Sequence, residues 1–598
     1  MRILTSIACA GLLLAPCPSA AQSADQVLVV VNTASAASQA IAEAYVAARH
    51  VPAAHVVRLD VPVSDDITRA DYLRLVEGPI AKAIARARLH DQVNYLVLTK
   101  DVPLRIAGTS GRLGTVGSVD SELALLYRKM SGRPTPPDGR IDNPYFLGNA
   151  PLVTARPFSH ADHDIYLVTR LDGFSRDDAR ALVTRGIAAR DAGTVVFDLK
   201  AGLDDIGNRW LDEAAGRLGA LGLGDRVRIE RSSEVVRDTD GLIGYASWGS
   251  SDPAITVRRL GLGFVPGALA TSFVSTDART MTAPPDTWTV GDWNNRQAFY
   301  AGSPQSLLGD MIAQGVTGAA GNVAEPLLDG VVRPQVLFPA WFSGFTLGEA
   351  FYLAMPFLGW QGVVVGDPLA VLVPATRLPA GAVPSLDAAT ELPAWFAGRR
   401  LQAIRATDAE GAAARAFLKA ESRLARDDVA GGREALEETV RLAPRSVIAQ
   451  QQLGGLYERE RRWDDAIACY RAILDVQPRD VVALNNLAYA LAEHKQRPGD
   501  ALPYAERAQA LAPREGSVAD TLALTYHLLG RTADALRFSN LAVSLAPSNA
   551  EVVLNRAAIL LANGDTRGAQ AALDAALTLD PALELQAKAV AIRAGLAR

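Results

Sequence analysis

The C-terminal third of the chain repeats one short ending five times: VRLAP at 440–444, LDVQP at 474–478, QALAP at 509–513, VSLAP at 543–547 and LTLDP at 577–581. The prolines that close these endings are separated by 34, 35, 34 and 34 residues. Proline cannot continue a helix, so each ending marks the boundary between two helical units. A fixed period of this length predicts stacked helix–turn–helix repeats.

The best-formed unit, 445–478, resembles the tetratricopeptide (TPR) repeat. Small residues at its consensus positions let the two helices of a repeat approach, and large residues fill the space between repeats. Those positions hold Leu453, Gly454, Tyr457, Ala466 and Tyr470. We therefore predict an all-α TPR solenoid over 401–598, ending in a capping helix within 582–598.

Stacked TPR repeats present a concave groove, so the sequence predicts a protein or peptide partner. The first helix of each repeat carries polar residues near the expected groove-facing positions, and each could equally be an ordinary solvated residue. These candidates are Asn485, Asn486, Tyr489, Asp520, His527 and Asn555. Cys469, on a second helix, is expected to be a small core residue.

The composition is that of an ordinary globular protein. The 598 residues are 49% hydrophobic and 21% charged, with a net charge of −5. This excludes a wholly disordered, collagen-like or coiled-coil chain and allows two to four domains. Because Lys and Arg form no long block, we expect no nucleic-acid partner.

Residues 1–21 read as a secretory signal peptide. Arg2 supplies the basic start, 3–14 is mostly apolar, and small residues at Ser19 and Ala21 predict cleavage before Gln22. The run is too short to span a bilayer, and we expect no membrane span elsewhere. The predicted location is the periplasm or the extracellular space.

The cysteine count restricts the chemistry of the exported chain. Cys9 and Cys17 leave with the leader, so the mature monomer keeps Cys469 alone and is expected to form no internal disulfide. Lipidation at Cys17 is the alternative, which Pro16 disfavours.

The front half alternates short apolar runs with amphipathic stretches. This pattern predicts an α/β fold with a mostly parallel sheet covered by helices on both faces. We expect an N-terminal α/β subdomain at 22–130, a Pro/Gly-rich connection at 131–159, a second α/β subdomain at 160–372 and a linker at 373–400. The expected strands are 27–31, 56–60, 95–99, 165–169, 194–198, 242–246, 268–274 and 362–366.

Ligands of open α/β sheets sit beyond the carboxyl ends of the strands. Polar residues follow the predicted strands there, although each could instead be a helix cap, a turn former or half of a structural ion pair. The binding candidates are Asn32, Lys100, Arg170, Asp172, Trp248 and Asn322, and the catalytic candidates are Ser247, Asp252, Ser275, Asp277 and Glu325. No Gly-rich phosphate loop is present, which argues against nucleotide binding in those modes.

The segment 241–370 resembles the gingipain-type, caspase-like cysteine peptidases. It contains GLIGYASWGS, ALATSFVST and SLLGDMIAQGVTGAAG in the family's order, followed by LGEA (347–350) and GDP (366–368). The resemblance implies a catalytic His after one strand and a catalytic Cys after the next. Here Trp248 stands at the His position, and the second strand is expected to end in Phe273-Val274-Ser275 without a cysteine. Thiolate chemistry is therefore excluded.

Nearly the whole chain resembles an uncharacterised family of exported bacterial proteins found in genomes that carry the exosortase protein-sorting system. The similarity covers NYLVLTKDVPLRI (94–106), SVDSEL (118–123), VTRLDG (168–173), SWGSSDP (247–253) and GVTGAAGNVAEP (315–326). It implies an envelope or extracellular-matrix setting, and some members end in TPR repeats.

Two metal sites are open from the sequence. His160, His163 and Asp164 could form a zinc site, although a polar loop is the simpler interpretation. Carboxylates could instead hold calcium, in which case the oxygens would come from Asp252, Asp277, Asp292, Glu325 and Asp329. Our prediction is no cofactor, with calcium as the alternative.

The favoured interpretation is an exported interaction scaffold. Its TPR groove would bind an envelope protein or peptide, and its peptidase-like module would be catalytically degenerate. The alternative is a hydrolase with a rebuilt, non-cysteine site at the strand ends and substrate recruited by the repeats.

Overall fold

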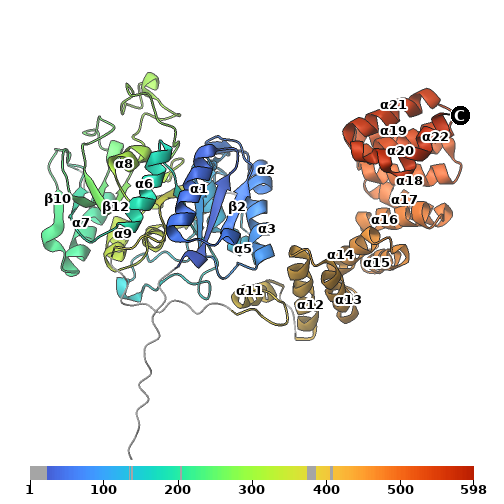
Figure 1. The fold of residues 1–598 in the computed structure, drawn as a ribbon, viewed down its shortest axis with the longest axis horizontal. Helices are drawn as coiled ribbons and strands as arrows, with labels where there is room; N and C mark the ends of the chain where they lie inside the picture. The colour runs from blue at the N-terminus through green and yellow to red at the C-terminus, as the bar shows by residue number, and fades with distance from the viewer. Residues whose placement is uncertain are drawn as a thin grey trace, which may run out of the picture. The chain divides into compact units, whose positions relative to one another are not determined.

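The computed structural model describes residues 23–133, 135–136, 139–202, 205–372, 385–404 and 408–597. The expected leader at 1–21 lies outside the described residues, as does the part of the predicted linker at 373–384. The chain divides into two compact units, one up to Asp387 with Leu392–Ile404, the other Ala388–Glu391 with the chain from Arg405 on (Figure 1). Each unit is described by itself.

Ten strands of the first unit form one sheet. Their order is β10 (Val227–Glu230), β9 (Thr194–Asp198), β11 (Leu242–Ser247), β12 (Phe264–Ser272), β13 (Gly318–Asn322), β15 (Gly362–Gly366), β8 (Leu167–Leu171), β4 (Tyr95–Thr99), β1 (Val27–Asn32) and β2 (Val56–Leu59). β13 and β15 pair antiparallel, and a single bridge between Val365 and Arg170 joins β15 to β8. The seven other neighbouring pairs are parallel, as the buried apolar runs predict.

The two predicted α/β subdomains therefore share one sheet, because β8 pairs with β4 over Tyr95–Thr99. Two of the expected strands are displaced by two residues or more. The run expected at 165–169 is β8 at Leu167–Leu171, and the run expected at 268–274 is β12 at Phe264–Ser272.

Helices cover both faces of the sheet. On one side α1 (Ala36–Arg49) packs on α6 (Arg176–Ile187), which also contacts α8 (Leu308–Gln314) (Figure 1). On the other side α9 (Pro334–Phe342) packs against both α7 (Ile206–Ala220) and α10 (Leu347–Ala354).

Between Pro334 and Ala354 the chain forms two separate helices, α9 and α10. The chain turns through Gly344 at φ 90°, and Thr346 starts α10 with a capping box to Glu349.

Shorter elements fill the connections of the first unit. They are α2 (Arg69–Asp71), the π-helix η3 (Tyr72–Glu77), α3 (Gly78–Ala87), α4 (Val119–Ala124) and α5 (Leu126–Met130). A small sheet joins β3 (Asp66–Ile67), β5 (Arg105–Ile106) and β6 (Gly117–Ser118). The expected connection at 131–159 includes β7 (Ile141–Asp142), which pairs with β14 (Phe357–Leu358).

The end of the predicted linker 373–400 is a packed helix, which corrects that prediction. α11 (Ala394–Ile404) belongs to the first unit. The Asp91 carboxylate accepts the backbone N–H groups of Trp395 (2.9 Å) and Phe396 (3.2 Å) in its first turn, and the Phe396 ring stacks on His90. The carboxylate thus satisfies N–H groups that a helix start leaves free. The repeat unit begins at 405, with 388–391 added, rather than at 401.

The second unit is a row of helix pairs with the predicted period. The pairs are α12 (Asp408–Ala425) with α13 (Val429–Leu442), α14 (Val447–Arg459) with α15 (Trp463–Val476), α16 (Val481–Tyr489) with α17 (Pro498–Leu511), α18 (Gly516–Leu528) with α19 (Thr532–Leu545), and α20 (Ala550–Ala562) with α21 (Thr566–Leu579). The predicted capping helix is α22 (Ala587–Leu596). Within the described residues, no helix is long and apolar enough to cross a membrane.

The 35-residue spacing between Pro478 and Pro513 has a structural counterpart. α16 continues into a π-helical turn, η9 (Ala490–His494), whose wider turn takes up an additional residue. The other four first helices run as regular α-helices. Glu493 lies within this π-turn.

The small residues between paired helices set the packing distance. Ala535 on α19 is fully buried, whereas Ala533 two residues earlier is exposed. We predict that Ala535→Leu destabilises the repeat unit by about 1–3 kcal/mol, because the added carbons enter a filled interface. Urea unfolding followed by far-UV circular dichroism measures this. Ala533→Leu is the matched control, and equal effects of the two changes would contradict the packing.

Candidate functional site

The loops after β4, β8 and β12 meet at one edge of the large sheet. Lys100, directly after β4, donates from Nζ to Asp172 Oδ1 (3.2 Å) and to the Gly173 carbonyl (2.7 Å), which follow β8. The same ammonium donates to the Met281 carbonyl (3.3 Å) in the segment after β12. The structure thus brings Lys100 and Asp172 together at the strand ends.

A hollow of about 70 Å³ lies beside this contact. Asp65, Lys100, Asp101 and Asp172 contribute to its walls. Burial raises the pKa of Asp65, while a hydrogen bond from Thr280 acts in the opposite direction. The Lys100 ammonium in the wall of this hollow is already shared by a carboxylate and two carbonyls.

Two other binding candidates hold the backbone rather than face a cavity. Arg170 is fully buried and donates to Asp120, to Asp172 Oδ2 (3.3 Å) and to the Val102 carbonyl (3.0 Å). Asn32 is also fully buried and donates to the Asp101 carbonyl (2.7 Å). Both residues fix the loops after their strands, which is the structural alternative weighed for them.

The end of strand β12 differs from the sequence expectation: the strand ends two residues earlier than predicted. β12 ends at Ser272, which lies beside Ser247 at the end of β11. Ser272, not Ser275, therefore occupies the end of β12. Trp248 points elsewhere: its Nε1 donates to Asn208 Oδ1 (2.8 Å), and its ring packs edge-on against Phe273.

Ser272 has a carboxylate partner that sequence reasoning did not pair with it. Its Oγ donates to Asp277 Oδ2 at 3.1 Å, and Asp277 Oδ1 accepts the backbone N–H of Asn322 at 2.9 Å. Asp277 is 3% exposed, and this burial raises its pKa to about 7 despite both hydrogen bonds. The register of β12 on β11 is the signal that could have identified Ser272.

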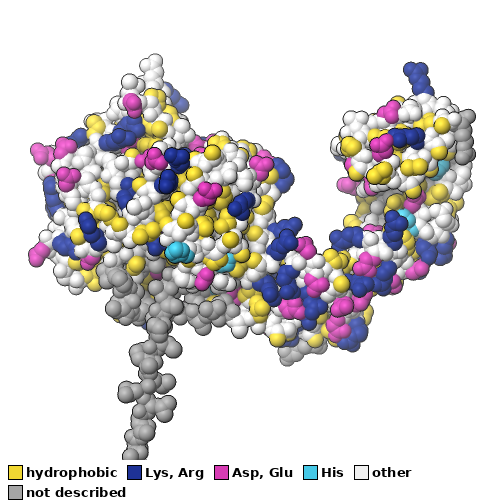
Figure 2. Space-filling view, viewed as in Figure 1, with side chains coloured by type: hydrophobic (Ala, Val, Ile, Leu, Met, Phe, Trp, Pro, Cys, Tyr) yellow, Lys and Arg dark blue, Asp and Glu magenta, His cyan; other side chains and the backbone are white. Residues whose placement is uncertain are grey.

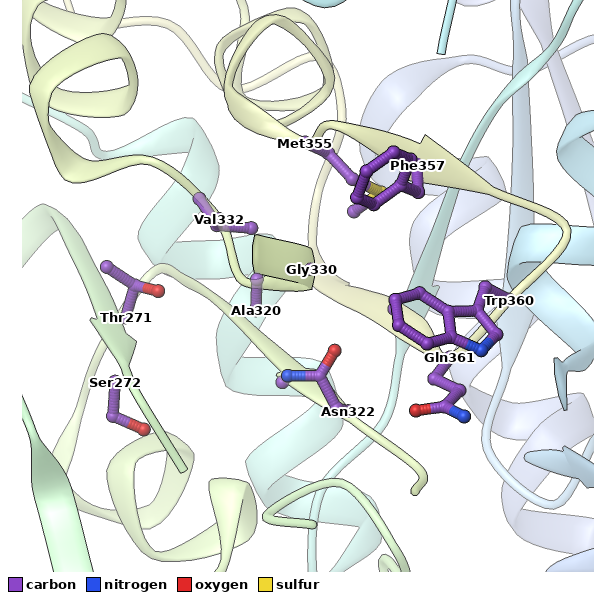
Figure 3. A pocket seen from close by; sticks show the side chains of 12 residues that line it. Thr271, Ser272, Ala320, Asn322, Gly330, Val332, Met355, Phe357, Trp360 and Gln361 are labelled. Atoms are coloured by element: carbon purple, nitrogen blue, oxygen red, sulfur yellow. The ribbon is translucent and has the colours of Figure 1, made fainter. Parts of the chain in front are cut away.

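The space around Ser272 is small. It lines two hollows of about 10 and 30 Å³, the first of which is bounded by Asn322, Met355 and Trp360 (Figure 3). Volumes of this size hold one or two water molecules. Gly249 is needed beside it: it adopts φ 52°, and a Cβ there would lie 3.2 Å from the Ser272 Cβ.

Of the remaining catalytic candidates, Ser247 is paired with Ser272 across the two strands, but none of them lines either hollow. Ser247 Oγ accepts the Gly249 N–H (3.0 Å), and Asp252 Oδ1 accepts the Ala254 N–H (2.9 Å) in a local turn. Glu325 is exposed and accepts the Leu327 N–H (2.8 Å). Ser275 follows β12 by three residues and lines neither hollow.

The two metal hypotheses gain no support from the geometry. Among the described residues no three His, Cys, Asp or Glu side chains are grouped as a metal site. Asp329 pairs with Arg140 (2.6 Å), and Asp292 accepts a local N–H of Asn294 (2.8 Å). His160 contacts the Val93 carbonyl (2.8 Å), and Asp164 pairs with Arg128 (2.9 Å).

In the repeat unit, two of the groove candidates are in direct contact. Asn555 Nδ2 donates to Asp520 Oδ2 at 2.7 Å, between α20 and α18. Burial raises the pKa of Asp520 to about 7, and Glu551 and Glu493 act in the same direction. Tyr489 on α16 is half-buried, with a pKa of about 12 for the same reason, and Asn485 contacts Asn486.

The network continues to a residue that sequence reasoning missed. Lys588 on α22 donates to Asn555 Oδ1 (2.7 Å) and pairs with Glu493 Oε1 (2.9 Å) on η9. The contacts that link Glu493, Lys588, Asn555 and Asp520 thus connect four elements of the repeat unit. Cys469 is a buried free cysteine, as expected.

Comparisons with known proteins find local similarity. No family model matches the chain. Protein O-mannosyl-transferase Tmtc2 of Drosophila melanogaster is 35% identical over 86 residues, which are 14% of this chain and 9% of the transferase. The chain thus spans under a tenth of that relative's length.

Solved structures match over about a third of the chain. MamA from Desulfovibrio magneticus RS-1 is 19% identical, covering 29% of this chain and 97% of that one, with a TM-score of 0.26. YrrB, a TPR protein with an unusual peptide-binding site, is 16% identical over 35% and 100%, with a TM-score of 0.27. PilW, a type IV pilus biogenesis factor, is 16% identical over 32% and 88%, with a TM-score of 0.28.

The raised pKa of Asp277 has a consequence for stability. Its carboxyl group ionises near pH 4 in the unfolded chain but near pH 7 in the fold, so stability from this group is full below pH 4 and is lost as the pH rises to 7. At about 1.4 kcal/mol per pKa unit, the loss reaches about 4 kcal/mol. We predict that Asp277→Asn unfolds at a more similar temperature at pH 5 and pH 8 than the parent protein does.

Tryptophan fluorescence measures this, because Trp463 is the one tryptophan in the repeats and the others report on the first unit. Asp252→Asn is the control, since that side chain makes a local turn contact. An unchanged pH dependence in Asp277→Asn would disprove the assignment.

Proposed function

We propose that this protein is an exported interaction scaffold whose TPR groove binds a protein or peptide, and that its front α/β unit is a non-catalytic, gingipain-like module. The observation that carries the proposal is the polar network along the first helices of successive repeats. Surface polar residues normally face water singly, whereas these are partly buried and joined across α18, α20, η9 and α22.

The order of elements in the front unit supports the peptidase-like part. β11 and β12 are adjacent and parallel, α8 leads into the Gly-Ala-rich β13, LGEA starts α10, and GDP follows β15. The layout therefore agrees with the resemblance, while Trp248 and Ser272 stand where the catalytic pair would be. Without an imidazole or a thiol at these two positions, this end of the sheet has neither the base nor the nucleophile of that family.

Export is proposed from the sequence of 1–21. The distribution of charged side chains bears on how a partner would be recognised. Lys, Arg, Asp and Glu side chains are interspersed over both units, with no large area of one sign on the face shown in Figure 2. Association would then depend on a specific groove rather than on a general electrostatic surface.

Photo-crosslinking in the producing cell tests the groove. A benzoyl-phenylalanine at Tyr489, on a first helix, should crosslink a discrete partner. The same amino acid at Arg471, exposed on the second helix α15, is the matched control and should not yield that product. Identical products from both positions, or none from position 489, would contradict groove binding.

The hydrolase alternative is favoured by one observation, the Ser272–Asp277 hydrogen bond. A serine hydrolase with an activated hydroxyl reacts with fluorophosphonates. We predict no labelling of the purified protein by a fluorophosphonate dye, because the hollows beside Ser272 hold one or two waters only. Labelling that Ser272→Ala removes would establish the hydrolase instead.

A further inference from the structure

The first helices of the repeats carry a row of buried oxygen atoms without hydrogen-bond partners. These are Gln452 Oε1 on α14, Asn485 Oδ1 on α16 and Asp520 Oδ1 on α18. All three are acceptors, and among the described residues none of them finds a donor. A buried acceptor without a donor costs free energy, so this side of the repeats is incomplete as it stands.

The next first helix shows how such an acceptor is satisfied. On α20, Asn555 Oδ1 accepts from the ammonium of Lys588, which comes from the last helix of the chain. The ammonium also pairs with Glu493 on the π-turn η9, and the Asn555 amide group donates a hydrogen bond to Asp520. A cation supplied by the chain itself therefore occupies one end of the row.

This position is suited to exchange. The Lys588 side chain is 26% exposed and that of Glu493 is 21% exposed, so solvent reaches the ion pair. Glu551 on α20 and Glu493 both act on Asp520 with negative charge, and Lys588 is the cation that offsets them. A competing cation would find the Glu493 carboxylate and the Asn555 amide oxygen at the place of the ammonium, and Asp520 and Glu551 add negative charge to these surroundings.

We propose that the groove recognises lysine or arginine side chains of its protein partner, and that Lys588 is an internal ligand which such a side chain displaces. The proposal rests on the proposed groove binding and adds the chemistry of the occupant. An ammonium or guanidinium donates several hydrogen bonds and accepts none, which matches a row of acceptors. Charge complementarity of this kind sets partner choice.

Peptide binding by the full-length protein tests this. The probes are fluorescein-labelled (Gly-Lys)₄ and (Gly-Glu)₄ amides, followed by fluorescence anisotropy. Lys588→Met removes the internal ammonium and keeps the apolar stem, and should bind the lysine peptide at least tenfold more tightly than the parent protein. Adding Asp520→Asn to that variant should return the affinity to the parental value or below.

Lys419→Met is the matched control, because it removes the same charge from a half-buried pair with Glu391 (3.6 Å) elsewhere in the same unit. It should leave the affinity unchanged. Equal gains in both variants, or equal binding of the glutamate peptide, would overturn the proposal.

A second measurement needs no variant and so does not depend on the folding of Lys588→Met. The lysine peptide should raise the acetylation rate of Lys588 by acetic anhydride severalfold, read by mass spectrometry, while Lys419 stays unchanged. An unaltered rate at Lys588 would overturn displacement. Failure of either test leaves the crosslink from position 489 intact, so it is distinguishable from failure of groove binding itself.

Discussion

The first unit is organised around a guanidinium withdrawn completely from water. Arg170 lies at the end of β8, where the strands from the two halves of the chain meet in one sheet. Removing a cation from water costs several kcal/mol unless charge and hydrogen bonds replace the solvent. Asp120, Asp172 and the carbonyls of Val102 and Pro103 do so, and their positions are thereby fixed. Asp172 in turn holds Lys100, so the strand-end edge depends on this buried charge.

Polar residues at the ends of β11 and β12 also hold the fold together. Trp248 is tied to Asn208 and Phe273, and Asp277 is tied to Ser272 and the Asn322 backbone. Ser272 could not be found from the sequence, because the end of β12 is set by its register on β11, and an irregularity between Leu242 and Gly244 shifts that register. The residue pattern of one strand does not show which residues of the neighbouring strand it pairs with.

The repeats were predictable for the opposite reason, since their contacts are local and periodic. The proline spacing gave the helix pairs from α12 to α21, and the 35-residue interval coincides with η9. Only part of the polar network in the repeat unit could be predicted from the sequence. Asp520 and Asn555 stood out as polar residues on first helices, but Lys588 and Glu493 did not. Their pairing depends on how far the stack curves before α22 returns to η9, which no local pattern states.

The two groups of buried polar atoms have different physical consequences. At the strand ends the carboxylates of Asp172 and Asp277 accept hydrogen bonds from donors of the protein itself. This edge of the sheet therefore needs no ligand to satisfy them. Along the first helices Gln452, Asn485 and Asp520 keep unpartnered acceptors, each of which costs the folded state about 1–3 kcal/mol. A ligand that supplies donors removes part of this cost and therefore stabilises the stack as it binds. The incompleteness of the groove, rather than the polar edge of the sheet, is what marks a place for a partner.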